Sequence, residues 1–168
     1  MTDGRCLCGA LRYQIDGPFV DMVHCHCSMC RKHHGAPFAT WAVAPLSGFR
    51  WVGDTSTLAT YKSSEKGHRE FCRVCGSVAP LLDEAIGLAI APAGNLVDDP
   101  GVRPTKHMFV ASKAAWHAIT DALPQYDEYP PEFGMPSTPR EPVAVTPGVT
   151  QGSCLCGDVA YEISTAPL

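Results

Sequence analysis

The residues best suited to chemistry in this sequence are nine cysteines, which fall into four tight clusters. Clustered thiolates at short spacings are typical of zinc sites, because Zn²⁺ is borderline soft and accepts tetrahedral sulfur coordination. The spacing therefore predicts metal binding. The clusters are Cys6-x-Cys8, Cys25-x-Cys27-x-x-Cys30, Cys72-x-x-Cys75 and Cys154-x-Cys156.

The first and third clusters together supply four sulfurs, which suits a closed tetrahedral site that stabilises a fold. A glycine directly after each cluster permits the tight turn that such a pair of sulfurs needs. The alternative is that one or two of these residues are buried free cysteines. The predicted structural ligands are Cys6, Cys8, Cys72 and Cys75.

The second cluster supplies three sulfurs on one short loop, from Cys25, Cys27 and Cys30. A metal held by three protein ligands keeps its fourth position for water or substrate, which is the arrangement of catalytic sites. Three thiolates blunt the Lewis acidity of zinc relative to a three-histidine site. Such a centre is better suited to binding an incoming thiol than to generating hydroxide, so the cluster indicates sulfur–carbon chemistry.

A protein ligand could instead close this second site and make it structural. Four histidines lie nearby in the sequence: His24, His26, His33 and His34. Successive side chains of a strand point to opposite faces, so we expect the first two to point away from the sulfurs. His33 and His34 remain possible ligands, and we favour the open site.

Short strands and turns must position these clusters, because 15 glycines and 15 prolines in 168 residues disfavour long helices. One helical turn is expected at 28–32 with Ser28 as its cap, a knuckle at 72–76, and a short helix or turn at 112–120. Apolar patterning predicts strands at 11–16, 20–23, 38–43, 49–52, 58–62, 69–71, 78–82, 88–91 and 107–111.

Size and charge exclude several classes of protein. A chain of this length with 45% apolar residues fits one domain and a remainder. An excess of 17 acidic over 13 basic residues, without a run of Lys or Arg, disfavours nucleic-acid binding. No signal-like segment and no run of about 20 apolar residues stands out, so we expect a cytoplasmic protein without a membrane. Thiols stay reduced in that compartment, and the odd cysteine count also disfavours disulfides.

The C-terminal part holds a proline-rich linker and a repeat. Seven prolines fall between Pro124 and Gly148, a composition typical of an extended segment. After it, residues 152–163 match residues 4–15 at seven of twelve positions, including Gly-x-Cys-x-Cys-Gly and Tyr. This self-similarity indicates a second copy of the domain of which only the first strand is present.

Three cysteine segments with their flanking residues carry a resemblance to a known family. They are Gly4-x-Cys-x-Cys-Gly-x-x-x-Tyr, then His24-Cys-His-Cys-Ser-Met-Cys-Arg-Lys, then Phe71-Cys-x-x-Cys-Gly-Ser. These segments resemble the glutathione-dependent formaldehyde-activating enzyme family, which also includes centromere protein V. The later segments starting at Lys106 and Leu123 resemble the closing part of that family, so the likeness covers roughly residues 2 to 133.

The resemblance implies a mainly β, small zinc-binding fold of curved antiparallel sheets with short helical turns. It implies two zinc ions per chain, a structural one in the four-sulfur site and a catalytic one at Cys25, Cys27 and Cys30. We therefore expect a formaldehyde-activating-type zinc domain at 1–133, a proline-rich linker at 134–150 and the first strand of an incomplete second copy at 151–168.

The activity that the resemblance implies is the addition of glutathione to formaldehyde or a similar small aldehyde. The product would be S-hydroxymethylglutathione, and the enzyme class a carbon–sulfur lyase. Arg31 or Lys32 would then bind a carboxylate of glutathione, and His33 or His34 could shuttle the proton. The alternative is a non-catalytic zinc-binding module for protein interaction or thiol binding.

Two further groups of residues carry expectations. Aromatic side chains at strand spacing belong to the core more often than to a pocket, which we expect of Trp41, Phe49 and Trp51, and packing is expected of Trp116. Cys154 and Cys156 have no second Cys-x-x-Cys in this chain. They could stay free, oxidise, or compete with Cys6 and Cys8 for the Cys72–Cys75 half-site in this molecule or in a neighbour. Such a strand exchange could give a homodimer through the C-terminal strand.

Overall fold

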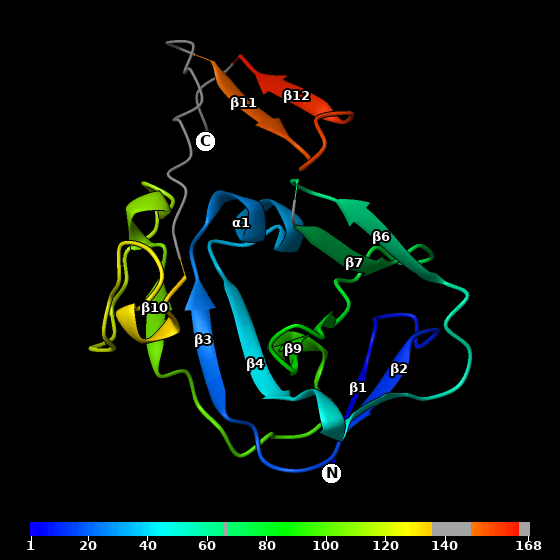
Figure 1. Cartoon of the computed structure of the whole chain (residues 1–168). Coiled ribbons are helices and arrows are strands. Elements are labelled where there is room, and N and C mark those ends of the chain that lie inside the picture. The colour runs from blue at the N-terminus through cyan, green and yellow to red at the C-terminus, as the bar shows by residue number, and fades with distance from the viewer. Residues whose placement is uncertain (66, 136–148, 165–168) are drawn as a thin grey trace.

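The computed structural model describes residues 1–65, 67–135 and 149–164 and consists mainly of short strands in several sheets (Figure 1). The expectation of a mainly β fold of antiparallel sheets with short helical turns is confirmed. The helical elements are α1 (Ser28–His34) and 3₁₀ turns at Leu46–Gly48, Ala93–Asn95, Val110–Ser112 and Pro131–Phe133. The strands are β1 (Thr2–Arg5), β2 (Arg12–Ile15), β3 (Asp21–Cys25), β4 (Ala39–Pro45), β5 (Phe49–Trp51), β6 (Leu58–Lys62), β7 (His68–Cys72), β8 (Leu81–Asp83), β9 (Leu88–Pro92), β10 (Lys106–Met108), β11 (Thr150–Ser153) and β12 (Ala160–Ile163).

A five-stranded sheet forms the centre of the domain, in the order β10-β3-β4-β9-β8. All its pairs are antiparallel except β10 with β3, which run parallel. Alanines fill the middle of this sheet, where Ala42 pairs with Ala91 and Ala44 with Ala89, all fully buried. Small side chains there allow a second layer to approach the sheet closely.

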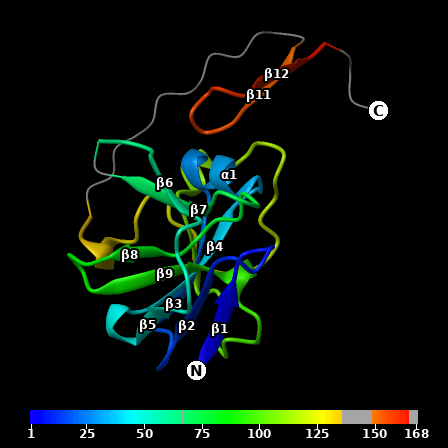
Figure 2. The same cartoon turned by 90° about the vertical axis from the view of Figure 1, so that its right-hand side faces the viewer.

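That second layer is the three-stranded sheet β1-β2-β5, in which β1 and β2 lie side by side as a hairpin (Figure 2). Tyr13 and Ile15 on β2 are buried against Ala44 and Ala91 of the central sheet. Phe49 and Trp51 also pack into this core, and Trp41 is buried in the neighbouring one. The expectation that these three aromatic residues belong to the core is confirmed.

Helix α1 follows β3 closely, so that its N-cap residue Cys27 and its first-turn residue Cys30 lie near the end of that strand. It is one short segment, and the cationic Arg31 and Lys32 in its last turn interact favourably with the helix dipole. Cys27 caps its start, because the Cys27 side chain accepts from the Cys30 N–H, so the expectation that Ser28 is the cap is wrong. The helix ends at Gly35 in the left-handed conformation, with φ at 59°.

Three local predictions differ from the structure. The strand expected at 78–82 is reduced to Leu81–Asp83, with only an isolated bridge at Val78, because Pro80 lacks a backbone N–H for a ladder. The strand expected at 107–111 ends at Met108, since Phe109 adopts a left-handed backbone with φ at 59°. The turn or short helix expected at 112–120 is present as a turn at 115–116, but Trp116 within it is 76% exposed, so the packing expected of that residue is wrong.

The knuckle expected after β7 is confirmed, since the Gly76 N–H donates to the Cys72 carbonyl at 2.8 Å and Gly76 has φ at 74°. Beyond the domain, residues 136–148 of the expected linker and the last four residues lie outside the described part of the chain. The described repeat forms a hairpin of β11 and β12. No helix in the described residues is long and apolar enough to cross a bilayer.

Replacing Gly4 with alanine should destabilise the domain by about 2–3 kcal/mol, because the new methyl group overpacks the core. A Cβ at Gly4 would lie 2.1 Å from Cζ of Tyr13, which is only 1% exposed and has no space to move into. Urea unfolding followed by circular dichroism measures the change.

The repeat offers a matched control for this prediction, since a Cβ at Gly152 would lie 2.2 Å from Cζ of Tyr161. Tyr161 is 58% exposed, and its ring can rotate into solvent. Gly152→Ala should therefore change the unfolding free energy of the domain by less than about 0.5 kcal/mol. Equal effects of the two substitutions would contradict the argument.

Candidate metal centres

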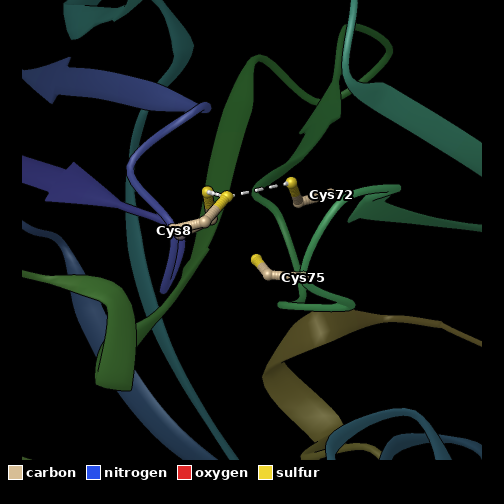
Figure 3. Close-up of side chains that lie close together, drawn as sticks. Cys8, Cys72 and Cys75 are labelled. Carbon is tan, nitrogen blue, oxygen red and sulfur yellow. Dashed lines mark hydrogen bonds between the residues drawn. The ribbon is translucent and has the colours of Figure 1, made fainter.

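Four cysteine sulfurs from two distant segments form the first group, which we call the scaffold cluster. Cys6 and Cys8 follow β1, Cys72 ends β7 and Cys75 lies in the knuckle after it. Their Sγ atoms all lie within 4.8 Å of one another, and Cys8 Sγ is 3.5 Å from Cys6 Sγ and 3.8 Å from Cys72 Sγ. Figure 3 shows the side chains of Cys8, Cys72 and Cys75 converging. Four sulfurs this close can hold one tetrahedral metal ion.

Backbone and hydroxyl donors hold these sulfurs in place. The Leu11 N–H donates to Cys6 Sγ at 3.3 Å, and the Leu7 N–H donates to Ser77 Oγ at 3.0 Å, which joins the first loop to the knuckle. Ser77 Oγ is also 3.3 Å from Cys75 Sγ. Hydrogen bonds with the Ser77 side chain, the Ser77 backbone and Cys8 together lower the pKa of Cys75 to about 5 and so favour the thiolate that a metal ion binds.

The second group consists of Cys25, Cys27 and Cys30, which we call the three-thiol cluster. Cys25 ends β3, Cys27 caps α1 and Cys30 lies in its first turn, so strand and helix meet at the sulfurs. The three Sγ atoms lie within 4.8 Å of one another. Among the described residues, no histidine nitrogen or carboxylate oxygen joins this group. Soft thiolate donors in this number suit zinc and leave it one further position.

Apolar side chains surround the three-thiol cluster. Cys25 and Cys30 are buried, whereas Cys27 is only partly covered. Trp41 and Met108 pack against the cluster from the central sheet, and Tyr129 packs from the loop that follows β10. An apolar shell lowers the local dielectric and strengthens every charge interaction at the sulfurs.

The charges at this cluster favour a thiolate on Cys27. Hydrogen bonds from the thiols of Cys25 and Cys30 lower the pKa of Cys27, and the positive charge of Arg69 on β7 lowers it further. Arg69 Nε is buried and has no hydrogen-bond partner within the described residues. Sequence reasoning missed Arg69. Strand alternation places it on the opposite face of β7 from Cys72, but the sequence does not reveal which element packs against that face.

Two predicted histidines lie beside the cluster without joining it. Burial lowers the pKa of His33 and of His34 to about 4, so both imidazoles are neutral at pH 7. The Nε2 atoms of both side chains are buried without a partner in the part of the chain described. His34 packs edge-on against Trp41, with ring centroids 4.8 Å apart.

An open pocket of about 340 Å³ lies between α1 and the knuckle. Its volume falls at the lower end of the roughly 300–1,000 Å³ typical of small-ligand sites. Polar groups of Thr40, Ser77 and Asn95 line it, together with His33 and His34. It is therefore a candidate space for a polar ligand, and Val78 of its lining also packs in the apolar core that holds Cys25 and Cys30.

The two predicted basic residues of α1 have different surroundings. The half-buried Arg31 donates to the His26 carbonyl at 3.3 Å and to the Ser112 carbonyl at 3.1 Å. Lys32 is exposed, and its Nζ donates to Ser153 Oγ at 2.5 Å and to the Cys154 carbonyl at 3.4 Å, both in the C-terminal hairpin. Arg31 therefore braces the loop of the cluster, whereas Lys32 contacts the C-terminal hairpin.

A chain of hydrogen-bonded side chains, which sequence reasoning missed, holds the loop of the three-thiol cluster through the buried His26. His26 Nε2 is 2.8 Å from His107 Nδ1, and His107 Nε2 is 3.1 Å from both carboxylate oxygens of Asp121. Because the carboxylate accepts from His107 Nε2–H, His107 Nδ1 accepts from His26 Nε2–H. His24 Nδ1 is hydrogen-bonded to Thr40 Oγ1. His24 and His26, the two histidines expected to point away from the sulfurs, are thus hydrogen-bonded to side chains outside the three-thiol cluster.

This fold and these clusters define a class: a small β-rich domain with one four-thiol and one three-thiol group, each of which could hold a metal ion. Residues 1–112 match the model of the glutathione-dependent formaldehyde-activating enzyme family, which is more than half of the 168 residues. The chain belongs to this family, and the resemblance seen in the sequence is confirmed.

Two similar proteins give further context. A protein of Schizosaccharomyces pombe (strain 972 / ATCC 24843), named as an uncharacterized lyase, is 30% identical over 77 residues, which are 45% of this chain and 53% of the relative. The chain thus spans about half the length of the curated relative it matches. A crystal structure of a Rhodobacter sphaeroides protein is 29% identical, with a TM-score of 0.46, and the match covers 61% of this chain and 91% of the other.

Proposed function

We propose that this chain adds glutathione to formaldehyde or a similar small aldehyde at the three-thiol cluster, as a carbon–sulfur lyase acting in the direction of synthesis. The observation that carries the proposal is a group of three thiols that no other ligand-type side chain in the described residues joins. Membership of the formaldehyde-activating family and the lyase name of the yeast relative support it.

The proposed metal content is two zinc ions per chain. Cys6, Cys8, Cys72 and Cys75 would hold one in a structural role, and Cys25, Cys27 and Cys30 would hold the other. A zinc ion at the three-thiol cluster would supply a soft Lewis-acid position that lowers the pKa of an incoming thiol.

The reaction joins the glutathione sulfur to the aldehyde carbon. The carbon–sulfur bond forms as the π electrons of the carbonyl move to its oxygen. The thiol loses its proton, and the resulting alkoxide oxygen takes up a proton, so that the product is a hydroxymethyl thioether. Arg69 contributes positive charge at the cluster, which stabilises negative charge on sulfur or oxygen. His33 and His34 are weak bases at neutral pH because burial lowers the pKa of each to about 4, so the thiol proton leaves to water in this proposal.

The pocket beside the cluster and two cations of α1 would bind the rest of glutathione. Thr40, Ser77 and Asn95 offer hydrogen bonds to peptide groups within the pocket. Both cations keep only part of their donors for a carboxylate, since Arg31 already bonds to two carbonyl groups and Lys32 Nζ already donates to Ser153 and Cys154. The proposed partners are thus a small thiol and a small aldehyde, without nucleic acid or membrane.

Exchange NMR on mixtures of formaldehyde and glutathione tests this proposal. Zinc-loaded protein should accelerate exchange between free and S-hydroxymethyl glutathione above the spontaneous rate, and chelation of the metal should remove the acceleration. Equal exchange rates with loaded protein, chelated protein and buffer would refute the catalytic function and favour a non-catalytic thiol-binding or protein-binding module.

A further inference from the structure

The loop of the three-thiol cluster is joined to the rest of the domain through His26, the residue between Cys25 and Cys27. We propose that His107 and Asp121 are positioning residues for the metal ion of this cluster, and that they act through His26 on the geometry of the three sulfurs. The inference rests on the zinc content proposed for the cluster, and it does not depend on which thiol or aldehyde reacts there.

Three polar groups of His26 are bonded to other parts of the domain. Its backbone N–H donates to the Met108 carbonyl at 2.9 Å, and its carbonyl accepts from Arg31 Nε at 3.3 Å. Its side chain is bonded through Nε2, which lies 2.8 Å from His107 Nδ1. A residue held at both backbone groups and at its side chain resists both translation and rotation. The cysteines on either side of it are therefore held as well.

The other end of this chain of hydrogen bonds is anchored in the segment 121–126. The His107 N–H donates to the Pro124 carbonyl at 2.8 Å, and the His107 carbonyl accepts from the Tyr126 N–H at 2.9 Å. Asp121 accepts from His107 Nε2–H at 3.1 Å and from the Leu123 N–H at 2.9 Å. The imidazole of His107 is thus fixed from its backbone and from its far nitrogen, and it offers His26 a rigid acceptor.

Burial makes the bond between the two histidines costly to remove. His26 and His107 are both almost fully buried. A buried donor that loses its acceptor keeps the full cost of having left water. Without His107, the loop would have to move until His26 Nε2–H reached another acceptor or solvent, and the sulfurs would move with it.

The chain of hydrogen bonds ends at His26 within the described residues. Because His107 Nδ1 accepts from His26 Nε2–H, His26 Nδ1 carries no proton, and this buried atom has no partner in the part of the chain described. No histidine nitrogen there joins the group of three sulfurs. His107 and Asp121 therefore reach the sulfurs only through the backbone of residues 25–27, which is the arrangement of a support and not of a proton path.

Metal affinity is sensitive to support of this kind. A binding site works when its ligand atoms are held within about 0.5 Å of the required geometry. Replacing a side chain that orients metal ligands typically weakens metal binding by about 10- to 100-fold. His107→Phe fills similar space but cannot accept from His26, so it should weaken metal binding at the three-thiol cluster by at least about tenfold.

Titration of the full chain with Co²⁺ in reducing buffer, followed by visible absorption, tests the proposal. The absorption of a cobalt–thiolate centre depends on the number and geometry of its sulfurs. Cys27→Ser keeps the scaffold cluster and lacks the third sulfur of the other one, so the difference from the wild type isolates the three-thiol signal. His107→Phe should weaken this signal's affinity and change its band shape. His107→Asn, whose Oδ1 replaces Nδ1 as acceptor, should restore both.

Thr105→Val is the matched control, and a second pair of variants covers a His107→Phe protein that does not fold. Thr105 donates to Asp21 Oδ1 at 2.7 Å, at the end of β3 that lies away from the cysteines, so its loss should leave the three-thiol signal unchanged. Asp121→Ala removes the acceptor for His107 Nε2–H and should weaken cobalt binding, whereas Asp121→Asn keeps an acceptor and should not. The cobalt signal of the scaffold cluster establishes that each variant is folded.

The outcomes separate this inference from the proposed function. Wild-type affinity and band shape in folded His107→Phe or Asp121→Ala would overturn the positioning role alone. An equal loss in Thr105→Val, or no recovery in His107→Asn, would also overturn it, since His107 would then act only on general stability. A wild type whose cobalt signal equals that of Cys27→Ser would overturn both the metal of the three-thiol cluster and the inference.

Discussion

Replacing Cys72 with serine should abolish the stable fold of the domain. Cys72 is fully buried at the end of β7 and is one of the four sulfurs of the scaffold cluster. A structural zinc ion contributes about 10–16 kcal/mol of apparent binding free energy, whereas a domain is stable by only about 5–15 kcal/mol. A site with three sulfurs and a hydroxyl binds zinc far more weakly, so most of that contribution is lost.

Circular dichroism, thermal unfolding and zinc analysis measure this effect. We expect a Cys72→Ser protein that is largely unfolded at 37 °C or insoluble, and a wild type that unfolds at a much lower temperature once its metal is chelated. The matched control is Cys154→Ser, which removes a sulfur from the exposed hairpin and should leave the melting temperature of the domain unchanged. A folded Cys72→Ser protein with the wild-type melting temperature would exclude a stabilising role for the cluster.

Replacing Cys27 with serine should abolish the proposed catalysis without unfolding the protein. Cys27 caps α1 by accepting from the Cys30 N–H at 3.3 Å, and serine is a good residue for that position. The substitution therefore keeps the helix start while it removes one of three sulfurs. A bound metal lowers a reaction barrier by several kcal/mol, so we expect a loss of at least roughly a hundredfold in the catalysed rate.

Exchange NMR of the glutathione–formaldehyde mixture gives the rate, and the spontaneous reaction sets its lower limit. Zinc analysis should show the loss of one ion per chain, and the melting temperature should stay close to that of the wild type. Cys156→Ser, which leaves the three-thiol cluster intact, should keep the full rate. If Cys27→Ser retained the wild-type rate, the three-thiol cluster would not be the site of the reaction.

Sequence alone predicted the grouping of the cysteines because thiol spacing and the adjacent glycines are local signals. Cys72, Cys75 and Gly76 form the expected knuckle, and the three-thiol loop leads into the expected helical turn. These features depend on a few neighbouring residues, each with one strong conformational preference.

The surroundings of the clusters depend on long-range packing and could not be predicted in the same way. Arg69 acts on Cys27 from a strand that follows it by some forty residues, and Asp121 contacts His107 from a segment without regular structure. Trp116 has the apolar character of a core residue, but it is Ala114 of the same turn that is buried, while Trp116 faces solvent. Hydrophobic periodicity along the sequence predicts which face of a helix or strand is buried, but it does not predict which other element packs against that face.

The parallel pairing of β10 with β3 has a consequence for the order in which the domain assembles. All four thiols of the scaffold cluster precede Gly76, whereas β10, which flanks Cys25 through its pairing with Met108, begins only at Lys106. Contacts between residues this distant in the chain form late, because closing a long loop costs entropy before any contact stabilises it. A chain emerging from the ribosome can therefore bring the four thiols of the scaffold cluster together before the strand that flanks the three-thiol cluster exists. The three-thiol cluster is enclosed last, once the rest of the domain is already built.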